Sequence, residues 1–210
     1  MQNIKISNDV LPLEKPSGFN RAIQIGSCLL DENHMQVRGQ LSDHRHDFES
    51  PDDAISVHDL VVRLTVRLSD NVITKAEFGL PLMAFENMCE KLPYGPEKLE
   101  GLSVFAGLSG KIRQYYGGKR SCFHLSSLLL AMVPSLTQCR SWNSDFKRAD
   151  ELLQADQVDG VMDAMLASAK NSCHAWEESE GGIPQDFRNK DYEKMLDRMA
   201  PRLLGRWRQS

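Results

Sequence analysis

The spacing of apolar residues changes at Pro81, and this change constrains the fold more than any other feature of the chain. Before Pro81, apolar and polar residues alternate in two stretches, 22–41 and 57–80. After it, apolar residues recur every three or four positions. Alternation is typical of half-buried strands, and the longer spacing is typical of amphipathic helices. We therefore expect an α+β fold, with an antiparallel β-sheet from the N-terminal half packed against helices from the C-terminal half.

Two hairpins are expected in the first half of the chain. The first comprises residues 22–41 and turns at the polar DEN in its middle. The second follows residue 57, is rich in β-branched residues and turns at Ser69–Asn71. The segment between them, 42–54, is polar and acidic, so we expect a loop there.

Helices are expected to occupy most of the second half. Proline and glycine residues separate the amphipathic stretches, and Pro134 lies inside one of them, where it should produce a kink. The last helix carries cations at four-residue spacing beside an apolar face, which we expect to cover the domain or an oligomer interface. The expected helices comprise residues 82–92, 105–116, 124–139, 152–169 and 190–208.

Composition narrows the class of protein. The formal net charge of -4 gives no general attraction to nucleic acid, so nucleic acid is not an expected partner. The chain shows neither an apolar run of about 18 residues nor the apolar core of a secretory signal, so we expect no membrane association and a cytoplasmic location. We expect one α+β domain over 20–176, after a loosely ordered segment 1–19 and before a linker and basic helix over 177–210.

The stretch GGKRSCFHL, residues 117–125, holds the first candidates for chemistry. A thiol and an imidazole are both zinc ligands, but Cys122 and His124 could share an ion only if an extended or turn backbone brought them together. Alternatively, Cys122 at a helix N-terminus is a reactive thiol, favoured by Lys119 and Arg120. The third interpretation is that both side chains are purely structural.

Further candidates lie elsewhere in the chain. His58 falls within an expected strand and is either an ordinary strand residue or a ligand. The same question applies to two closely spaced pairs, His44 with His46 and Cys173 with His174. The five cysteines include no C-x-x-C pair, which favours reduced thiols over a disulfide framework. Walker loops, G-x-S-x-G, H-E-x-x-H and dinucleotide glycine motifs are missing from the sequence, which disfavours the corresponding enzymes.

An ordered set of short motifs runs along the chain: Arg21, GQLSD (39–43), VHDLVVRLTV (57–66), Cys89, LEGLSV (99–104), GGKRSCFHL (117–125), Gln138 and SCHAW (172–176). Together these motifs resemble a bacterial family of proteins of unknown function. The resemblance covers roughly residues 21–176. The family has glycine where this chain has Ser121 and threonine where it has Phe123, and lysine is usual where Arg45 stands.

The order of elements is also similar, more distantly, to that of iron–sulfur cluster scaffold proteins. That resemblance implies a ligand at His58, a second at Cys89, and a third group at Cys122 with His124. A histidine in the first position would favour a mixed nitrogen and sulfur site, such as zinc, over a typical iron–sulfur cluster.

These observations lead to one principal hypothesis about function. His58, Cys89, Cys122 and His124 would form a metal or reactive-thiol site. An open coordination position would make it catalytic, with Asp43 or Asp59 as the base. The alternatives are a non-enzymatic carrier of metal, sulfur or an iron–sulfur cluster, and an interaction protein with structural cysteines. A metal or small molecule is the expected partner, with a protein partner or second copy as candidates for the C-terminal helix.

Overall fold

The computed structural model describes residues 18–46, 54–91, 94–105 and 107–140, and five single residues. The single residues are 159, 160, 163, 170 and 177. The chain divides into two units, Met1–Thr137 and Gln138–Ser210. The expected helix over 190–208 and the pair Cys173 and His174 lie outside the described residues, as does most of the expected helix over 152–169.

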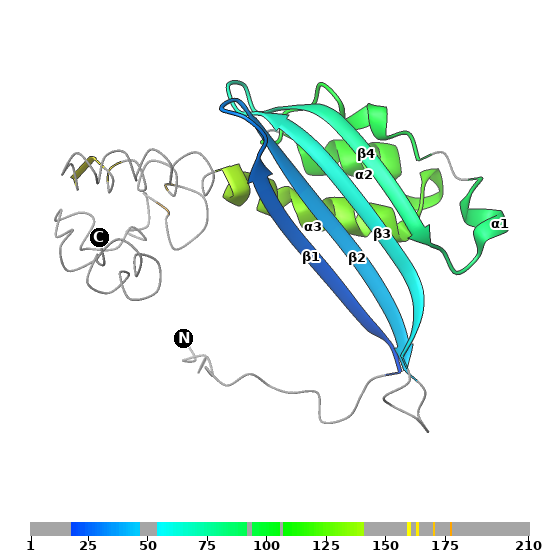
Figure 1. Cartoon of the computed structure of the whole chain (residues 1–210). Helices are drawn as coiled ribbons and strands as arrows, with labels where there is room; N and C mark the ends of the chain where they lie inside the picture. The colour runs from blue at the N-terminus through cyan, green and yellow to red at the C-terminus, as the bar shows by residue number, and fades with distance from the viewer. Residues whose placement is uncertain are drawn as a thin grey trace, which may run out of the picture. The chain divides into compact units, whose positions relative to one another are not determined.

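The first unit contains a four-stranded antiparallel sheet in the order β1-β2-β3-β4 (Figure 1). Both expected hairpins are confirmed. Each strand pairs with the next along the chain, so the topology is a meander. The strands are β1 (Asn20–Leu29), β2 (His34–His46), β3 (Ala54–Arg67) and β4 (Val72–Leu82).

The loop expected over 42–54 is wrong at both ends, because β2 continues to His46 and β3 begins at Ala54. The alternation of β2 does not stop at Leu41. Asp43, two residues further on, lies on the same face and is fully buried. This polar residue belongs to the core and not to a loop. Residues 47–53 lie outside the described part of the chain.

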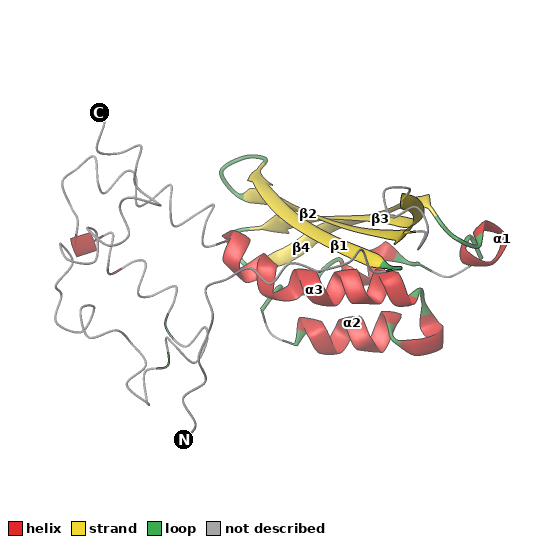
Figure 2. Ribbon diagram, turned by 90° about the horizontal axis from the view of Figure 1, so that it is seen from below, coloured by secondary structure: helices red, strands yellow, loops and turns green. Residues whose placement is uncertain are grey.

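Helices cover one face of the sheet, and the α+β expectation is confirmed (Figure 2). The predictions for 105–116 and 124–139 correspond to α2 (Leu108–Tyr116) and α3 (Phe123–Arg140). Pro134 lies inside α3 at an exposed position. None of the helices in the described residues is both long enough and apolar enough to cross a membrane.

The helix expected over 82–92 is wrong in extent, because only α1 (Glu86–Cys89) is helical there. β4 continues through Pro81 to Leu82. An edge strand tolerates a proline, and the pairing of β3 with β4 is irregular at this point, where Asp59 pairs with Leu82 and Val61 with Gly79. Two short 3-10 helices complete the described elements, η1 (Pro96–Leu99) and η2 (Gly118–Arg120).

The core lies between the sheet and α2 and α3. Gly39, in the middle of β2, allows α3 to approach the sheet closely, because a methyl group at this position would lie 2.5 Å from the sulfur of Met132. Alternate residues of β2 and β3 meet one stripe of α3 there. The buried apolar residues of these elements are Met35, Val37, Leu41, Leu60, Val62, Leu64, Val66, Leu125, Leu128, Leu129, Met132 and Leu136.

Candidate metal centre

Three neighbouring strands place Arg21, Asp43 and His58 in one row across the sheet. Arg21 of β1 pairs with Asp43 of β2, which pairs with His58 of β3. The row lies on the helix-covered face, since Asp43 is two residues from the buried Leu41 and His58 two residues from the buried Leu60. The register between β2 and β3 shifts immediately after Asp43.

Asp43 is the centre of this row. Its side chain has 0% exposure and accepts two hydrogen bonds from Arg21, Nε to Oδ1 at 2.7 Å and Nη2 to Oδ2 at 2.8 Å. Nδ1 of His58 lies 3.1 Å from Oδ2. Burial alone would raise the pKa of Asp43, but the Arg21 guanidinium, with smaller contributions from His124 and His58, lowers it below its ordinary value. The carboxyl group is therefore ionised.

The start of α3 brings Cys122 and His124 over the row. The Cys122 carbonyl accepts the Ser126 N–H at 3.0 Å, so Cys122 caps the helix and lies outside it, while His124 lies in the first turn. Because the backbone at Cys122 is not helical, the Cys122 thiol can approach the His124 ring. Two side chains in the same helical turn, two residues apart, could not do so. The Cys122 Sγ lies 3.6 Å from Nδ1 of His124.

Ser121 precedes Cys122 and stands where the family has glycine. It has φ −162° and ψ −169°, an extended conformation that any residue adopts. The left-handed position falls at Gly118 instead, with φ 60°. The backbone at residue 121 therefore does not require glycine.

The two imidazoles lie against each other and share Asp43. Their ring centroids are 3.9 Å apart with an interplanar angle of 33°. Nε2 of His124 lies 3.6 Å from Oδ2 of Asp43, the oxygen that also faces Nδ1 of His58. Burial lowers the pKa of His124, and the charges of His58 and Arg21 lower it further, against an opposing effect of Asp43. His124 is therefore neutral at neutral pH, the form that binds metals.

The distances within this cluster suit a metal ion. Asp43, His58 and His124 each offer one ligand atom, and these atoms all lie within 4.8 Å of one another. Cys122 is not a member of this group, and its thiol lies beside His124 alone of the three. Tetrahedral zinc, with bonds of about 2.3 Å to sulfur and about 2.0 to 2.1 Å to nitrogen, holds the two donor atoms about 3.5 to 3.6 Å apart. The distance from the Cys122 Sγ to Nδ1 of His124 is 3.6 Å.

Cys89, the fourth predicted ligand, is linked to the cluster through Tyr94. The Tyr94 hydroxyl donates a hydrogen bond to the Cys89 carbonyl at 3.0 Å. Burial, followed by the nearby Cys122 and Cys89 thiols, raises the pKa of Tyr94 to about 12. Among the described residues, no contact joins the thiol of Cys89 to Cys122 or to either imidazole.

The remaining candidates lie apart from this cluster. Asp59 follows His58 in β3 and points to the opposite face, where it accepts hydrogen bonds from Gln40 at 2.8 Å and Ser42 at 3.2 Å. This placement does not favour Asp59 as a base acting at His58. His44 and His46 lie in β2 rather than in a loop.

Two residues of the site were not assigned a role from the sequence. Arg21 neutralises the charge of Asp43. The only indication of this role in the sequence is a single cation at a strand position that faces the helices. Tyr94 lies between Pro93 and Gly95, and no pattern in the sequence marks its hydroxyl as a neighbour of two thiols.

The fold and the cluster define an α+β protein with a candidate Asp/His metal centre at one end of an antiparallel sheet. Residues 19–138 match the family described as "Protein of unknown function (DUF2889)", and the chain belongs to that family. The match spans the four strands, α1, α2, all but the last two residues of α3, and every residue of the cluster. The expected resemblance to a family of unknown function is confirmed.

Neither the curated proteins nor the solved structures include a match to this chain. The more distant resemblance to iron–sulfur cluster scaffold proteins therefore gains no support from a known structure and stays a prediction.

Proposed function

We propose that this chain is a metal-dependent enzyme that binds one transition-metal ion, zinc by preference, through His58, Cys122 and His124. The observation that carries the proposal is the arrangement of the two imidazoles. Each has one nitrogen facing the same oxygen of Asp43, and the second nitrogen of His124 faces the Cys122 thiol.

Asp43 acts in this proposal as the residue that orients the ligands. A metal-binding histidine commonly donates its other ring N–H to a carboxylate, which selects the tautomer and the orientation of the ring. Nδ1 of His58 lies 3.1 Å from Asp43, which leaves Nε2 as the nitrogen with a free electron pair. Arg21 compensates the charge of Asp43, so this carboxylate need not bind the ion to be stable.

The donor set favours zinc over the hard cations. Thiolate and imidazole suit zinc, whereas calcium and magnesium select carboxylate, carbonyl and water oxygens. A thiolate and two neutral imidazoles carry one negative charge, which a divalent ion reverses to one positive charge.

Three protein ligands leave the fourth position of tetrahedral zinc open, and this is the property that separates catalytic from structural sites. An ion bound there would polarise a water molecule or a substrate carbonyl oxygen. Asp43 then positions both imidazoles. If Cys89 occupied the fourth position instead, the site would be closed and a carrier or structural role would follow.

Metal content tests the proposal directly. The full-length protein, purified without added metal, should contain about one zinc ion per chain, as measured by inductively coupled plasma mass spectrometry. After exchange with cobalt, the protein should show a thiolate-to-cobalt absorption band. The same spectrum would reveal an iron–sulfur cluster by its own colour.

The chain offers matched control variants for this experiment. Cys122→Ser, His58→Ala and His124→Ala should each lose the ion or the band. Cys28→Ser and His34→Ala should retain both, because Cys28 is exposed in β1 and His34 pairs with Asp31 at the far hairpin. A wild-type protein without stoichiometric metal, or a Cys122→Ser variant with an unchanged spectrum, would refute the proposal.

A second candidate function has its own geometric support. Cys122, His124 and Asp43 form a thiol, imidazole and carboxylate series, with 3.6 Å from Sγ to Nδ1 and 3.6 Å from Nε2 to Oδ2. This is the order of a nucleophile, its base and the group that orients the base. Iodoacetamide labelling separates the two candidates, since added zinc should protect Cys122 in the metal-dependent case and should leave its reactivity unchanged in the nucleophile case.

A further inference from the structure

We propose that Arg21 binds a carboxylate group of the substrate, which makes the substrate of the metal centre a carboxylic acid. This inference rests on the proposed function and names its substrate class. One edge of the Arg21 guanidinium group holds Asp43, and a second edge of the same group is left to bind an anion. The substrate would place its carboxylate on Arg21 and another oxygen on the ion.

The guanidinium group of Arg21 has two edges that can each hold a carboxylate by a pair of hydrogen bonds. It carries five N–H donors, one on Nε and two on each Nη atom. The edge formed by Nε and Nη2 donates to Asp43, at 2.7 and 2.8 Å. In the part of the chain that the structure describes, the edge formed by Nη1 and the second N–H of Nη2 has no hydrogen-bond partner. This second edge matches the two oxygens of a carboxylate.

Arg21 lies beside the imidazoles of the metal centre. Its Nη2 is 2.8 Å from Oδ2 of Asp43. The same oxygen lies 3.1 Å from Nδ1 of His58 and 3.6 Å from Nε2 of His124. The side chain of Arg21 is 26% exposed and that of His124 is 24% exposed, so both are accessible from solvent. An anion bound at Arg21 would therefore lie next to the ligands of the ion.

The guanidinium group is held in place from two directions. Asp43 is fully buried and fixes one edge of the group. The ring of Phe19 lies against the face of the group, with 5.6 Å between the ring centroid and Cζ of Arg21. A side chain that is ordered before binding loses little conformational freedom when a ligand binds. Arg21 is therefore preorganised to receive a carboxylate.

The charges around Arg21 favour a singly charged, planar anion. The proposed ion and the Cys122 thiolate together carry one positive charge, and Arg21 compensates Asp43. Of the lysine and arginine residues that the structure describes, Arg21 alone forms an ion pair with the cluster. A single guanidinium edge suits a carboxylate, whereas phosphate dianions are commonly held by several cations or backbone N–H groups.

Phenylacetate and phenylacetamide test the carboxylate, because they have similar shapes and differ in charge. Each would be titrated at neutral pH into the metal-free full chain, and NMR would follow the imidazole C–H signals of His58 and His124. We expect phenylacetate to shift both signals and to bind about tenfold more tightly than the amide. The signal of His34, which pairs with Asp31 at the far hairpin, should stay in place.

Arg21→Lys tests the arginine itself. Lysine keeps the positive charge beside Asp43 but lacks a second pair of parallel N–H donors. The affinity for phenylacetate should therefore fall about tenfold, to that of the amide. Arg67→Lys is the matched control, because Arg67 holds Asp70 through the same two atoms, Nε and Nη2, at a hairpin. This variant should bind phenylacetate as tightly as wild type.

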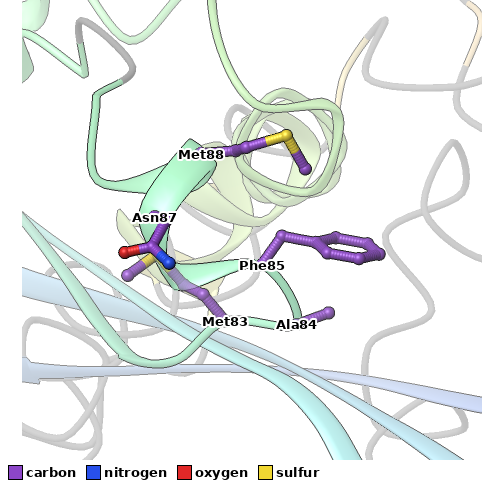
Figure 3. Close-up of a pocket in the computed structure, with 5 residues that line it drawn as sticks. All are labelled: Met83, Ala84, Phe85, Asn87 and Met88. Carbon is purple, nitrogen blue, oxygen red and sulfur yellow. The ribbon is translucent and has the colours of Figure 1, made fainter.

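Phe19→Leu is a second variant, which keeps the ion pair of Arg21 and Asp43. Loss of the ring beside the guanidinium should weaken phenylacetate binding about threefold. Phe85→Leu is its control and should leave this affinity unchanged, since Phe85 is also exposed, at 64%. The side chains that line the hollow around Phe85 include no cation: Met83, Ala84, Asn87 and Met88 (Figure 3).

Three results would overturn the inference while leaving the metal centre intact. The first is equal affinity for phenylacetate and phenylacetamide. The second is a folded Arg21→Lys variant that binds phenylacetate as wild type does or, if that variant does not fold, an unchanged affinity in Phe19→Leu. The third is tighter binding of inorganic phosphate than of phenylacetate. Because the titrations use metal-free protein, the expected pattern in a chain that binds no zinc would refute the metal proposal and retain the carboxylate site.

Discussion

Asp43 shows how a buried charge can organise a site. Its carboxylate is fully buried, and each group described around it is a cation or an imidazole. Removing one partner from such a group is costly, because the remaining charge stays buried without compensation. The cluster thus depends on Asp43 for stability as well as for the orientation of His58 and His124.

Asp43→Asn should weaken both properties. An amide can accept only through its oxygen, so it loses one of the two bonds from Arg21 and the charge that compensates it. We expect the free energy of unfolding to fall by about 2 to 4 kcal/mol and the affinity for zinc to fall about 10- to 100-fold. Urea denaturation and competition with a chelator measure the two effects.

Asp59→Asn is the control for Asp43→Asn, since Asp59 lies on the opposite face of the sheet. It should leave the affinity for zinc unchanged. A loss of affinity as large as that of Asp43→Asn would show that Asp59 acts at the site after all.

Ser121 carries a hydroxyl that the fold does not use. The residue is 7% exposed, and its Oγ has no hydrogen-bond partner among the described residues. Ser121→Ala removes this buried polar group, so we expect the free energy of unfolding to rise by about 1 kcal/mol. Ser126→Ala, which removes an exposed hydrogen bond to the Phe123 carbonyl, should give no gain in the same thermal or urea unfolding measurement. Destabilisation by Ser121→Ala would reveal a partner for the hydroxyl.

At the scale of the elements, the site depends on the distance between α3 and the sheet. His58 lies in β3, whereas Cys122 and His124 lie at the start of α3. Gly39 and Met132 set the approach of the two layers near the middle of the helix. A change at Gly39 should therefore alter a metal centre that it does not touch.

Gly39→Ala tests this coupling. The added methyl group would lie 2.5 Å from the Met132 sulfur, and Met132 is fully buried. We expect a loss of about 1 to 3 kcal/mol in the free energy of unfolding and a weaker cobalt absorption band. Gly26→Ala is the control in the neighbouring strand, where a methyl group would have no atom within 4 Å. Equal behaviour of the two variants would show that α3 and the sheet adjust independently of the site.

The helices and strands could be predicted from the sequence where one residue pattern dominated. β3 and β4 are rich in β-branched residues, and α3 carries a long apolar stripe, so local pattern and tertiary environment agree. The loop expected over 42–54 was wrong at residues 42–46 and 54, and the helix expected over 82–92 was too long, because tertiary contacts overrode the local signal. Asp43 is a polar residue in the core, and Pro81 is a proline in an edge strand.

At the scale of the whole molecule, the family match and the first unit coincide. The match covers 19–138 and the unit ends at Thr137. The buried apolar residues of the described chain lie between Met35 and Leu136. A fragment of residues 18–140, which keeps α3 whole, should therefore unfold cooperatively in urea and bind zinc as tightly as the full chain. A fragment with the fluorescence and circular dichroism of an unfolded chain would show that the second unit is needed for the fold.

The site could be predicted only in part from the sequence. His58, Cys122 and His124 were identified by residue type and by the resemblance, and the structure places His58 and Cys122 each beside His124. Asp43 and Asp59 could not be distinguished as candidate bases, because the face on which each lies depends on the register of β2 and β3. The contacts of Arg21 and Tyr94 could be assigned only when cross-strand pairing and loop contacts were known.

X-ray absorption fine structure of the zinc-loaded full chain tests the central claim most directly. The account predicts one sulfur at about 2.3 Å and three nitrogen or oxygen atoms at about 2.0 to 2.1 Å, with the sulfur lost in Cys122→Ser. A first shell with no sulfur, or with a sulfur that Cys122→Ser retains, would contradict it.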